Sequence, residues 1–276
     1  MNELISVIVS TYNREDALDA VLRALARQSD RRFEIVVADD GSGPATARVV
    51  AARAEQSPVP VRHVWHADLG FRLAAIRNRA ILASRGAYVV FLDGDCIARP
   101  GFVAAHRRLA EASWFVTGTR VLMSPALTGA VLGDGLEPEC WGWPQWLARR
   151  ARGEVNRVTP LLTLPLGGLR RRLRSRWRGA RGANMAFWRR DLDRVEGFDT
   201  AFEGWGREDS DIFIRMIRAG TGRKDGRWAT AVLHLWHREA DRSALQGNER
   251  RLDELVHGDR ITARAGLTAT AAEGTL

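Results

Sequence analysis

The chain has 276 residues, with 42 lysines and arginines against 33 acidic residues and a formal net charge of +9. An apolar content of 45% is enough for a sizeable core and excludes disordered and fibrous proteins. No apolar run approaches the roughly 18–20 residues of a membrane span, and the run at residues 4–9 lacks the basic leader of a signal peptide. Because Cys96 and Cys140 cannot form a disulfide framework, we expect a reducing compartment and a cytoplasmic location.

The first third of the chain alternates between strand and helix patterns. Apolar, β-branched runs predict strands, and apolar residues at helical spacing predict the helices between them. The predicted strands are residues 4–10, 33–38, 61–65 and 88–92, and the predicted helices are a run ending at Gln28, residues 45–54 and residues 73–84. This alternation predicts an α/β domain, with a parallel sheet covered by helices on both faces.

Three polar clusters stand where these strands end, at residues 10–14, 39–43 and 93–95. In sheets of this kind, ligands bind beyond the carboxyl ends of the strands. The position of the clusters is therefore the first sign of a functional site.

Residues 121–180 have a different composition. They hold five of the nine prolines and the tryptophans Trp141, Trp143 and Trp146, so we expect loops and short helices there and no core strands. This stretch divides the chain into residues 1–120, a basic insertion at 121–181, and residues 182–276.

Order returns at Gly182. The patterns predict a strand at residues 184–188, a helix at 190–195, an acidic loop at 203–209, a helix at 211–219 and a strand at 229–236. The tail from about Thr262 is small and polar, so we expect it to fray.

Asp93, Gly94 and Asp95 place two carboxylates on a tight turn after a buried strand. Such a pair can bind a divalent cation through oxygen ligands, and the cation would neutralise a diphosphate. The alternative is a solvated turn.

Asp39 and Asp40 follow the second predicted strand. A carboxylate here can accept hydrogen bonds from a base imide or a ribose hydroxyl. The alternative is an Asx-type turn in which Ser42 caps the next helix.

Three strings carry a resemblance to a known family: residues 5–14 (ISVIVSTYNR), 35–42 (IVVADDGS) and 91–95 (FLDGD). In this order they resemble the nucleotide-sugar-binding half of the family 2 glycosyltransferases. The resemblance implies the GT-A fold, a Rossmann-like single domain around a twisted, mostly parallel sheet. It also implies a nucleoside near Ser10, Tyr12 and Asp40. It places Asp93 and Asp95 near the diphosphate and a Mn²⁺ or Mg²⁺ ion, with Asp95 as the direct ligand.

Arg72 and Arg77 stand where that family places contacts to the diphosphate and the sugar. Arginine is suited to bidentate phosphate binding, whereas the alternative for each is an exposed helix face. We also assign Arg14, Asp39 and Gly94 to the donor site.

The second half contains the string GWGREDSD at residues 204–211. With residues 182–187 and 197–199 it resembles the acceptor half of β-1,4-galactosyltransferases and of bacterial chondroitin-type polymerases. An inverting transfer needs a carboxylate to take the proton of the acceptor hydroxyl. By the resemblance, Asp209 is that base and Glu208 positions the acceptor or shares the task. The alternative is that residues 209–211 only begin and cap a helix.

We assign acceptor binding to Glu208, Trp205, Gly206 and Asn184. His234 fits the place where related enzymes add a histidine to the metal site, and His237 is the alternative. Residues three apart on a strand point to opposite faces, so both can bind one ion only if the strand has ended.

The basic charge is concentrated in one segment. Residues 149–190 hold thirteen arginines and one acid, Glu154, which gives 13 − 1 = +12 and leaves about −3 for the remainder. No nucleic-acid-binding motif accompanies this charge, so we expect no nucleic-acid partner. Residues 149–181 could instead contact an anionic membrane surface, carry diphosphate-binding arginines on a lid over the donor site, or form a solvated loop.

These observations predict a metal-dependent inverting glycosyltransferase in the cytoplasm, peripheral to the membrane. Its donor would be a UDP-hexose or UDP-N-acetylhexosamine, and its acceptor a hydroxyl of lipopolysaccharide, capsule or a lipid-linked saccharide. A nucleotidyltransferase would need a glycine-rich phosphate loop where residues 11–14 stand. A non-catalytic sugar-binding module would lack Asp209 or the pair Asp93 and Asp95, and all three are present.

Overall fold

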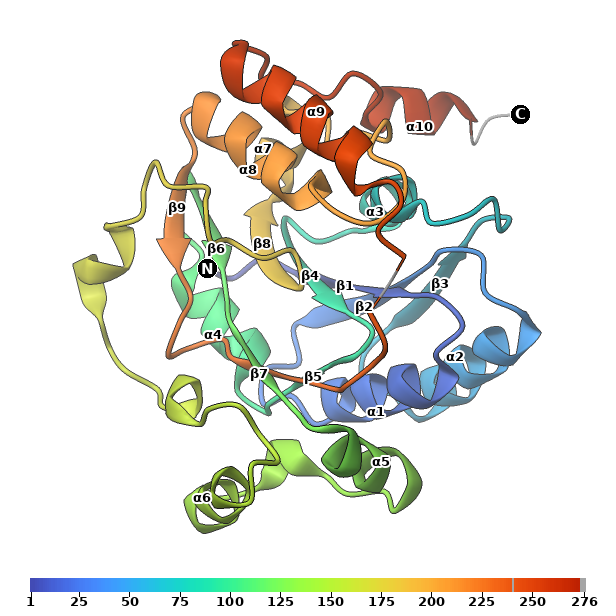
Figure 1. The fold of residues 1–276 in the computed structure, drawn as a ribbon, viewed down its shortest axis with the longest axis vertical. Helices are drawn as coiled ribbons and strands as arrows, with labels where there is room; N and C mark the ends of the chain where they lie inside the picture. The colour runs from blue at the N-terminus through green and yellow to red at the C-terminus, as the bar shows by residue number, and fades with distance from the viewer. Residues whose placement is uncertain (240, 274–276) are drawn as a thin grey trace.

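A central seven-stranded sheet forms the middle of the molecule (Figure 1). The structure is a computed structural model that describes residues 1–239 and 241–273. In spatial order the strands are β3 (Val61–Trp65), β2 (Phe33–Asp39), β1 (Ile5–Thr11), β4 (Tyr88–Asp93), β8 (Asn184–Trp188), β6 (Trp114–Thr117) and β9 (Gly222–Asp225). Only β8 runs antiparallel to its neighbours, so the predicted mostly parallel α/β sheet is confirmed.

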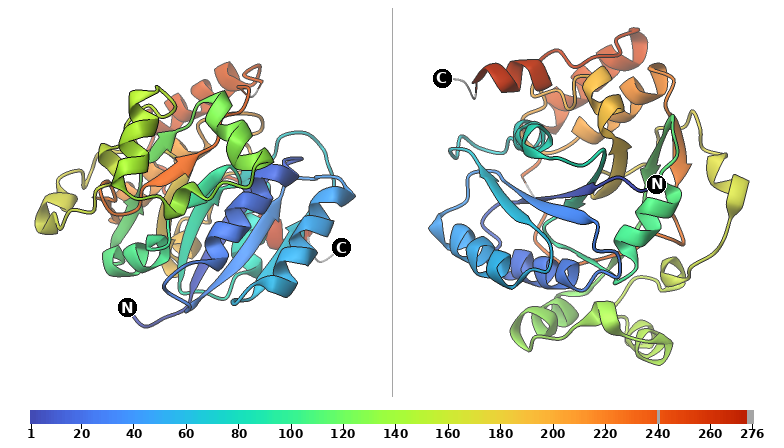
Figure 2. Two further views of the ribbon diagram at one scale, coloured as in Figure 1. Left: turned by 90° about the horizontal axis from the view of Figure 1, so that it is seen from below. Right: turned by 180° about the vertical axis from the view of Figure 1, so that it is seen from behind.

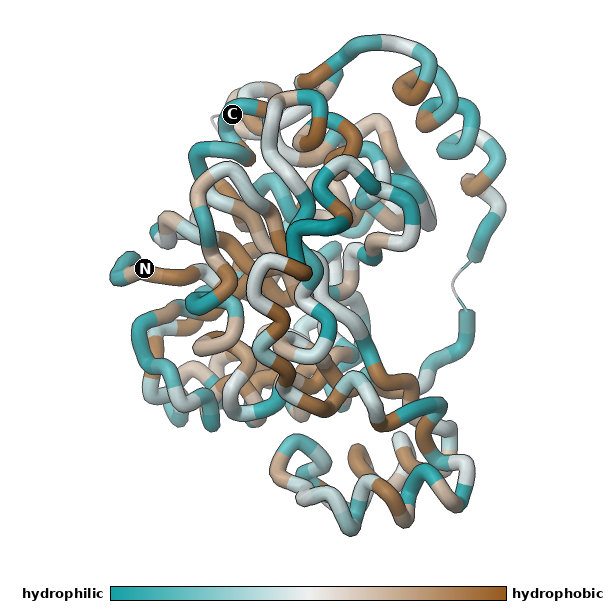
Figure 3. Tube along the Cα trace, turned by 90° about the vertical axis from the view of Figure 1, so that its left-hand side faces the viewer, coloured by the Kyte–Doolittle hydropathy of each residue, from teal (hydrophilic) through white to brown (hydrophobic). Residues whose placement is uncertain are grey.

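Helices cover both faces of this sheet, and each face has its own apolar core. Helices α1 (Glu15–Ala26), α2 (Pro44–Gln56) and α4 (Phe102–Leu109) contribute to one core. The other core contains α3 (Leu73–Ala83), α7 (Arg189–Arg194) and α8 (Glu208–Arg218). Val7 and Ile8 of β1 enter different cores, because successive side chains of a strand alternate between faces. Apolar residues accordingly gather along the central strands in Figure 3.

A second, three-stranded sheet has the order β5-β10-β7. Its strands are β5 (Cys96–Ala98), β10 (Val232–His234) and β7 (Arg120–Leu122). β10 is antiparallel to β5 and pairs His234 with Cys96. This register places His234 beside Asp95, although the two residues are far apart in sequence.

The basic insertion contains α5 (Pro125–Gly133), α6 (Trp143–Ala151) and three 3-10 helices, Pro138–Cys140, Thr159–Leu161 and Gly167–Arg171. Helices α5 and α6 lie beyond the main domain on the side of α1 (Figure 2). The predicted loops and short helices are confirmed here, apart from the two insertion residues that belong to β7. None of the helices in residues 1–239 and 241–273 is long and apolar enough to cross a membrane.

Several elements differ from the sequence prediction. The strand predicted at residues 229–236 is only Val232–His234, and the helix predicted from Asp211 already begins at Glu208. β9 was missed because its sequence, GRKD, is charged yet buried. The segments Phe102–Leu109 and Leu245–His257 (α9) were not recognised as helices.

The prediction that the tail frays from Thr262 is wrong for the residues described there. Helix α10 (Leu267–Glu273) lies beside α3 (Figure 1). Its Leu267 and Thr270 are buried, so these two side chains anchor the tail to the domain. Residues 274–276 of the same prediction lie outside the described residues.

Candidate active site

The first part of the site lies at the ends of β1 and β2, where Thr11 pairs with Asp39. Asp39 is buried, accepts the Ser42 N–H at 2.8 Å and lies 2.8 Å from His63 Nε2. Burial alone would raise the pKa of Asp39, but the hydrogen bonds from His63 and Ser42 lower it overall. Asp39 therefore stabilises the loop at residues 39–43 and links it to β3 through His63.

Asp40 is also buried, and its carboxylate is held by two partners. His66 Nε2 lies 2.6 Å from one oxygen, and the Arg72 backbone N–H donates to the other at 2.8 Å. Sequence reasoning missed both His63 and His66. His63 lies in the neighbouring strand β3 and His66 directly follows that strand, and this position could have identified them.

The mouth of this region is formed by exposed and partly exposed side chains. Tyr12 donates from its hydroxyl to Asp68 at 2.9 Å, and the Arg72 guanidinium donates to the Ala67 carbonyl at 2.9 Å. Arg14 lies 3.1 Å from Asp16, at the start of α1. The structure thus brings Tyr12, Arg72 and Asp40 to one loop cluster.

Ser42 does not cap the next helix, so that part of the alternative is wrong, whereas Asp39 does accept the Ser42 N–H as in an Asx-type turn. The Ser42 hydroxyl accepts the Asn13 N–H at 2.8 Å, and α2 begins after Gly43 without a side-chain cap. Ser42 instead fastens the loop after β2 to the loop after β1.

Arg77 of α3 lies at the centre of the site. Only 1% of the residue is exposed, so the exposed-helix-face alternative is wrong for this arginine. Its guanidinium contacts Asp93 at 3.0 Å, Glu208 at 3.4 Å and the Ser10 hydroxyl at 3.3 Å. It also lies over the ring of Phe198. Arg77 therefore joins residues predicted for the donor site to a residue predicted for the acceptor site.

Asp95, His234 and His237 form the one group among the described residues that could hold a metal ion. One ligand atom from each lies within 4.8 Å of the others. His234 Nε2 is 3.5 Å and His237 Nε2 is 3.2 Å from the same Asp95 oxygen. Because β10 ends at His234, the chain can turn and return His237 to the side that His234 faces. The two histidines, considered as alternatives from the sequence, lie together.

The acid and the histidines of this cluster affect one another's ionisation. Burial would raise the pKa of Asp95, but the hydrogen bond from His237 and the nearby His234 lower it overall. Burial lowers the pKa of His234. An ionised carboxylate beside a neutral imidazole is a suitable donor set for a transition metal such as Mn²⁺.

Asp93 lies outside this three-residue group and faces Arg77 instead. Burial raises the pKa of Asp93, and the nearby Arg77 opposes that rise. Between the two acids, Gly94 donates its N–H to the Ser10 carbonyl at 2.7 Å. A Cβ on Gly94 would lie 2.6 Å from that oxygen, so only glycine allows this close turn. Gly94 thus allows the turn to pack closely against β1.

Glu208 and Asp209 form the first turn of α8, after Arg207 in the left-handed backbone region with φ of 80°. Asp209 accepts the Gly182 N–H at 2.8 Å and the Ser210 hydroxyl at 3.2 Å. Burial and the charge of Asp209 raise the pKa of Glu208 to about 7, although Arg77 opposes the shift. The pair therefore offers two carboxyl groups in different environments.

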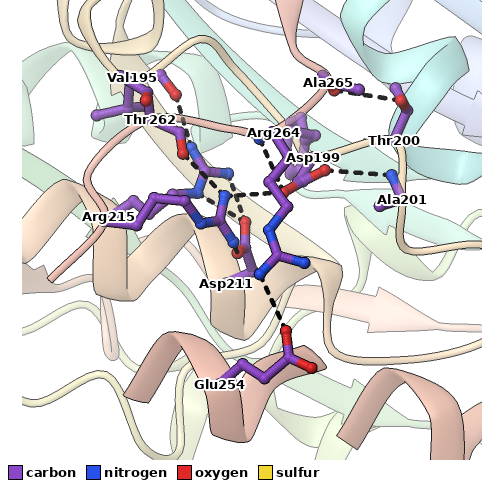
Figure 4. A network of polar contacts seen from close by, with 12 residues as sticks. Val195, Asp199, Thr200, Ala201, Asp211, Arg215, Glu254, Thr262, Arg264 and Ala265 are labelled. Carbon is purple, nitrogen blue, oxygen red and sulfur yellow. Dashed lines mark hydrogen bonds and ion pairs between the residues drawn. The ribbon is translucent and has the colours of Figure 1, made fainter. Parts of the chain in front are cut away.

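The next turn of α8 is fixed by a buried network of charges (Figure 4). Asp211 and Arg215 are fully buried and pair at 2.5 Å, and Arg215 donates to the Val195 carbonyl at 2.7 Å. Arg260 bridges Asp211 and Asp199, at 3.3 and 2.8 Å. Asp211 is thus structural: it joins the helix that carries Glu208 to the C-terminal segment.

The residues assigned to the acceptor are placed differently. Trp205 is 37% exposed, and the Arg242 guanidinium lies 4.9 Å from its ring centroid. Gly206 follows in the same loop with φ of 104°. Asn184 is buried, its amide contacts the Thr230 carbonyl and His106 Nε2, and it lines a pocket beside the site.

Two family models match the chain. One, described as Glycosyl transferase family 2, matches residues 6–173. The other, described as the N-terminal domain of galactosyltransferase, matches residues 169–231. The resemblance predicted for each half is confirmed.

Curated relatives agree with these matches. Validoxylamine A glucosyltransferase of Streptomyces hygroscopicus subsp. limoneus is 32% identical over 257 residues, which are 89% of this chain and 55% of that protein. Chondroitin synthase of Escherichia coli is 25% identical over 237 residues, 78% of this chain and 32% of that protein. The chain thus spans about half of the first relative and a third of the second.

Among solved structures, the mannosyltransferase PcManGT from Pyrobaculum calidifontis, in complex with GDP-Man and Mn²⁺, superposes with a TM-score of 0.60 at 19% identity. The match covers 99% of this chain and 69% of that one. This likeness confirms the predicted GT-A fold.

Proposed function

The chain belongs to glycosyl transferase family 2, and we propose that it moves a sugar from a nucleoside-diphosphate donor to a saccharide hydroxyl, with inversion at the anomeric carbon. The observation that carries this proposal is the position of Arg77. One buried guanidinium contacts Asp93 on the donor side and Glu208 on the acceptor side. The two groups of acids therefore face one reaction centre.

The nucleoside would lie in the loop cluster of Ser10, Tyr12 and Asp40, with Arg14, Asp39 and Arg72 around it. Tyr12 offers an exposed ring for a base, and Asp40 is held rigidly by His66. As donor we propose a UDP-hexose or UDP-N-acetylhexosamine, which the resemblance of residues 5–14 and 35–42 supports.

Asp95, His234 and His237 would hold a divalent cation, with Asp93 close to the same diphosphate. Two imidazoles favour Mn²⁺ over Mg²⁺, because magnesium prefers oxygen ligands. A bound ion would neutralise negative charge on the leaving diphosphate.

Asp209 is proposed as the base. The acceptor oxygen would form a bond to the anomeric carbon as the bond from that carbon to the diphosphate breaks, and the hydroxyl proton would pass to the Asp209 carboxylate. The Gly182 N–H holds this carboxylate in place. Glu208 would bind a second acceptor hydroxyl, with Trp205 offering a flat apolar face for the sugar ring.

As acceptor we propose a bacterial surface glycan, such as lipopolysaccharide or capsule, or a lipid-linked saccharide. The relationship to a chondroitin synthase supports a role in polysaccharide assembly. We also propose peripheral contact with an anionic membrane through residues 149–181, as a protein of the cytoplasmic face. Support comes from Leu162, Leu164 and Leu169, which are 39%, 36% and 50% exposed among the arginines.

A binding screen tests the donor proposal. Purified protein is titrated with UDP-glucose, UDP-N-acetylglucosamine, GDP-mannose and free UDP, each with and without Mn²⁺. We expect the UDP compounds to bind at least tenfold more tightly with the metal, and slow donor hydrolysis to follow. Equal or tighter binding of GDP-mannose would exclude the uridine assignment. If no nucleotide sugar were bound or hydrolysed, a non-catalytic sugar-binding module would be the better description.

A further inference from the structure

Beside the site lies a strongly basic pocket of about 430 Å³. Seven of its lining residues are arginines, and its one acidic residue, Asp225, pairs with Arg227 at 2.7 Å. Arg176, Arg178 and Arg181 come from the basic insertion, whereas Arg120 and Arg223 belong to the sheets. In Figure 1 the yellow segment that carries the first three arginines runs past β9. The pocket thus gathers positive charge from parts of the chain that are distant in sequence.

The pocket shares a wall with the candidate active site. Arg181 and Ala183 line it, and they flank Gly182, whose N–H binds Asp209. The Ala183 carbonyl accepts the Asp93 N–H at 3.3 Å. A ligand group in the pocket would therefore lie within a few residues of both the proposed base and the donor-side acid.

Some of these arginines hold the pocket in shape, and others have no carboxylate partner. Arg223 is buried and donates to the Arg176 and Arg178 carbonyls at 3.0 and 3.2 Å, so it holds the basic segment against β9. Within residues 1–239 and 241–273, by contrast, Arg120, Arg176 and Arg181 have no carboxylate within ion-pair distance. An uncompensated cluster of guanidinium groups around a cavity is a site for an anion.

We propose that this pocket binds an anionic group of the acceptor, a carboxylate or a phosphate carried on the saccharide near the reacting hydroxyl. The proposal rests on the proposed transferase function. The planar guanidinium groups match either anion with paired hydrogen bonds. The donor diphosphate is not the ligand we infer, because Asp95 and the two histidines, which would hold the cation beside that diphosphate, do not line the pocket. The pocket thus gives the basic insertion a role in selecting acceptors.

The test compares three matched sugars: glucose 6-phosphate, methyl β-glucuronide and glucose. Ligand-observed NMR at low ionic strength measures their binding to the wild-type protein and to an Arg176→Ala/Arg181→Ala variant. Both arginines are exposed, so the variant should fold, and a thermal melt checks this. We expect the wild type to prefer the two anionic sugars over glucose, and the variant to lose that preference by roughly tenfold or more.

A matched control removes the same charge elsewhere. Arg48→Ala/Arg85→Ala also loses two exposed arginines, away from the pocket, and should keep the preference. Anionic sugars that bound equally to the wild type and to the pocket variant would overturn the proposal. So would loss of the preference in the control, which would reflect net charge alone.

Titration with UDP and Mn²⁺ separates the pocket from the donor site. We expect the pocket variant to bind UDP as the wild type does. Loss of UDP binding in this variant would assign the arginines to the donor diphosphate and overturn the inference. If the variant lost only sedimentation with anionic vesicles, the segment would serve a membrane surface instead. Failure of the wild type to bind UDP would count against the proposed function, while the sugar titrations would still decide the pocket.

Discussion

Arg77 and Glu208 are 131 residues apart in sequence, yet their side chains lie 3.4 Å apart in the middle of the site. The same guanidinium contacts Asp93 at 3.0 Å. A buried cation between two acids limits the repulsion that those acids would otherwise feel. It also fixes the distance between the halves that we assign to donor and acceptor.

Replacing Arg77 should therefore damage both folding and binding. Arg77→Met keeps much of the side-chain volume but removes the buried cation that Asp93 and Glu208 face. We expect a loss of about 3–5 kcal/mol in the free energy of unfolding, the usual effect of breaking a buried ion pair. Urea unfolding at pH 7 measures it. Arg79→Met, on the outer part of the same helix, is the control, and equal losses in the two variants would remove Arg77 from this role.

The base assignment predicts a specific kinetic defect. Asp209→Asn keeps the shape of the side chain but cannot accept the proton, so turnover should fall by roughly 10²–10⁴-fold. Binding of UDP with Mn²⁺ should persist, since Asp209 lies on the acceptor side. Initial rates of sugar transfer and a UDP titration measure the two effects. Asp253→Asn, on the exposed side of α9, should be unchanged. Turnover of Asp209→Asn close to that of the wild type would show that another group takes the proton.

Metal binding should depend on three residues from two distant segments. Asp95→Asn and His237→Ala should each weaken Mn²⁺ binding at least tenfold, and excess chelator should abolish transfer. Electron paramagnetic resonance of free Mn²⁺ measures binding without reference to activity. His257→Ala, an exposed histidine on α9, is the control. Full activity in excess chelator would contradict a metal-dependent mechanism.

The donor side of this arrangement could be predicted from sequence because its signals are local. Each acidic cluster directly follows an apolar strand, and the residues of β1, β2 and β4 appear in order along the chain. Parallel pairing then brings Ser10 and Asp93 side by side, as their register shows.

The rest could not be predicted, because it depends on pairing between distant segments. His237 joins Asp95 only because β10 stops at His234 and pairs with β5. Arg77 is buried among Phe91, Phe198 and Glu208, which come from distant segments, so the periodicity of α3 does not reveal its burial. In β9 the charged residues Arg223 and Lys224 are buried because carbonyls and Glu111 accept their hydrogen bonds. No hydrophobic pattern marks such a strand.

Membrane contact predicts a role for the exposed leucines of the insertion. Arg170 of the insertion does not contribute to such contact, because it is buried and donates to the Asp225 and Arg227 carbonyls. Leu164→Ser/Leu169→Ser should at least halve sedimentation with anionic vesicles. Leu82→Ser, which changes an exposed leucine near the end of α3, serves as the control. Wild-type protein that never sediments with such vesicles would exclude the membrane proposal.

The raised pKa of Glu208 makes stability depend on pH in a definite direction. Its value rises from 4.5 to about 7 on folding, mainly through burial, so the folded chain holds this proton more tightly than the unfolded chain. Stability from Glu208 is therefore fully present below about pH 4.5 and is lost as the pH rises through about 7. The loss is on the order of 3 kcal/mol, from the free energy of one pKa unit. Glu208→Gln cannot ionise, so this variant should not show the loss of stability as the pH rises.

Urea unfolding of Glu208→Gln and of the wild type at pH 5, 6, 7 and 8, without added metal, isolates this contribution. Groups distant from Glu208 titrate alike in both proteins, so the difference in unfolding free energy reports on Glu208 and the acids coupled to it. The variant should gain stability relative to the wild type as the pH rises, most steeply between about pH 5 and 6.5, and the gain should level off above about pH 7. Glu55→Gln, on the exposed side of α2, should give a flat difference. A flat difference for Glu208→Gln as well would mean that Glu208 ionises near its ordinary pKa, as an open, solvated carboxylate would.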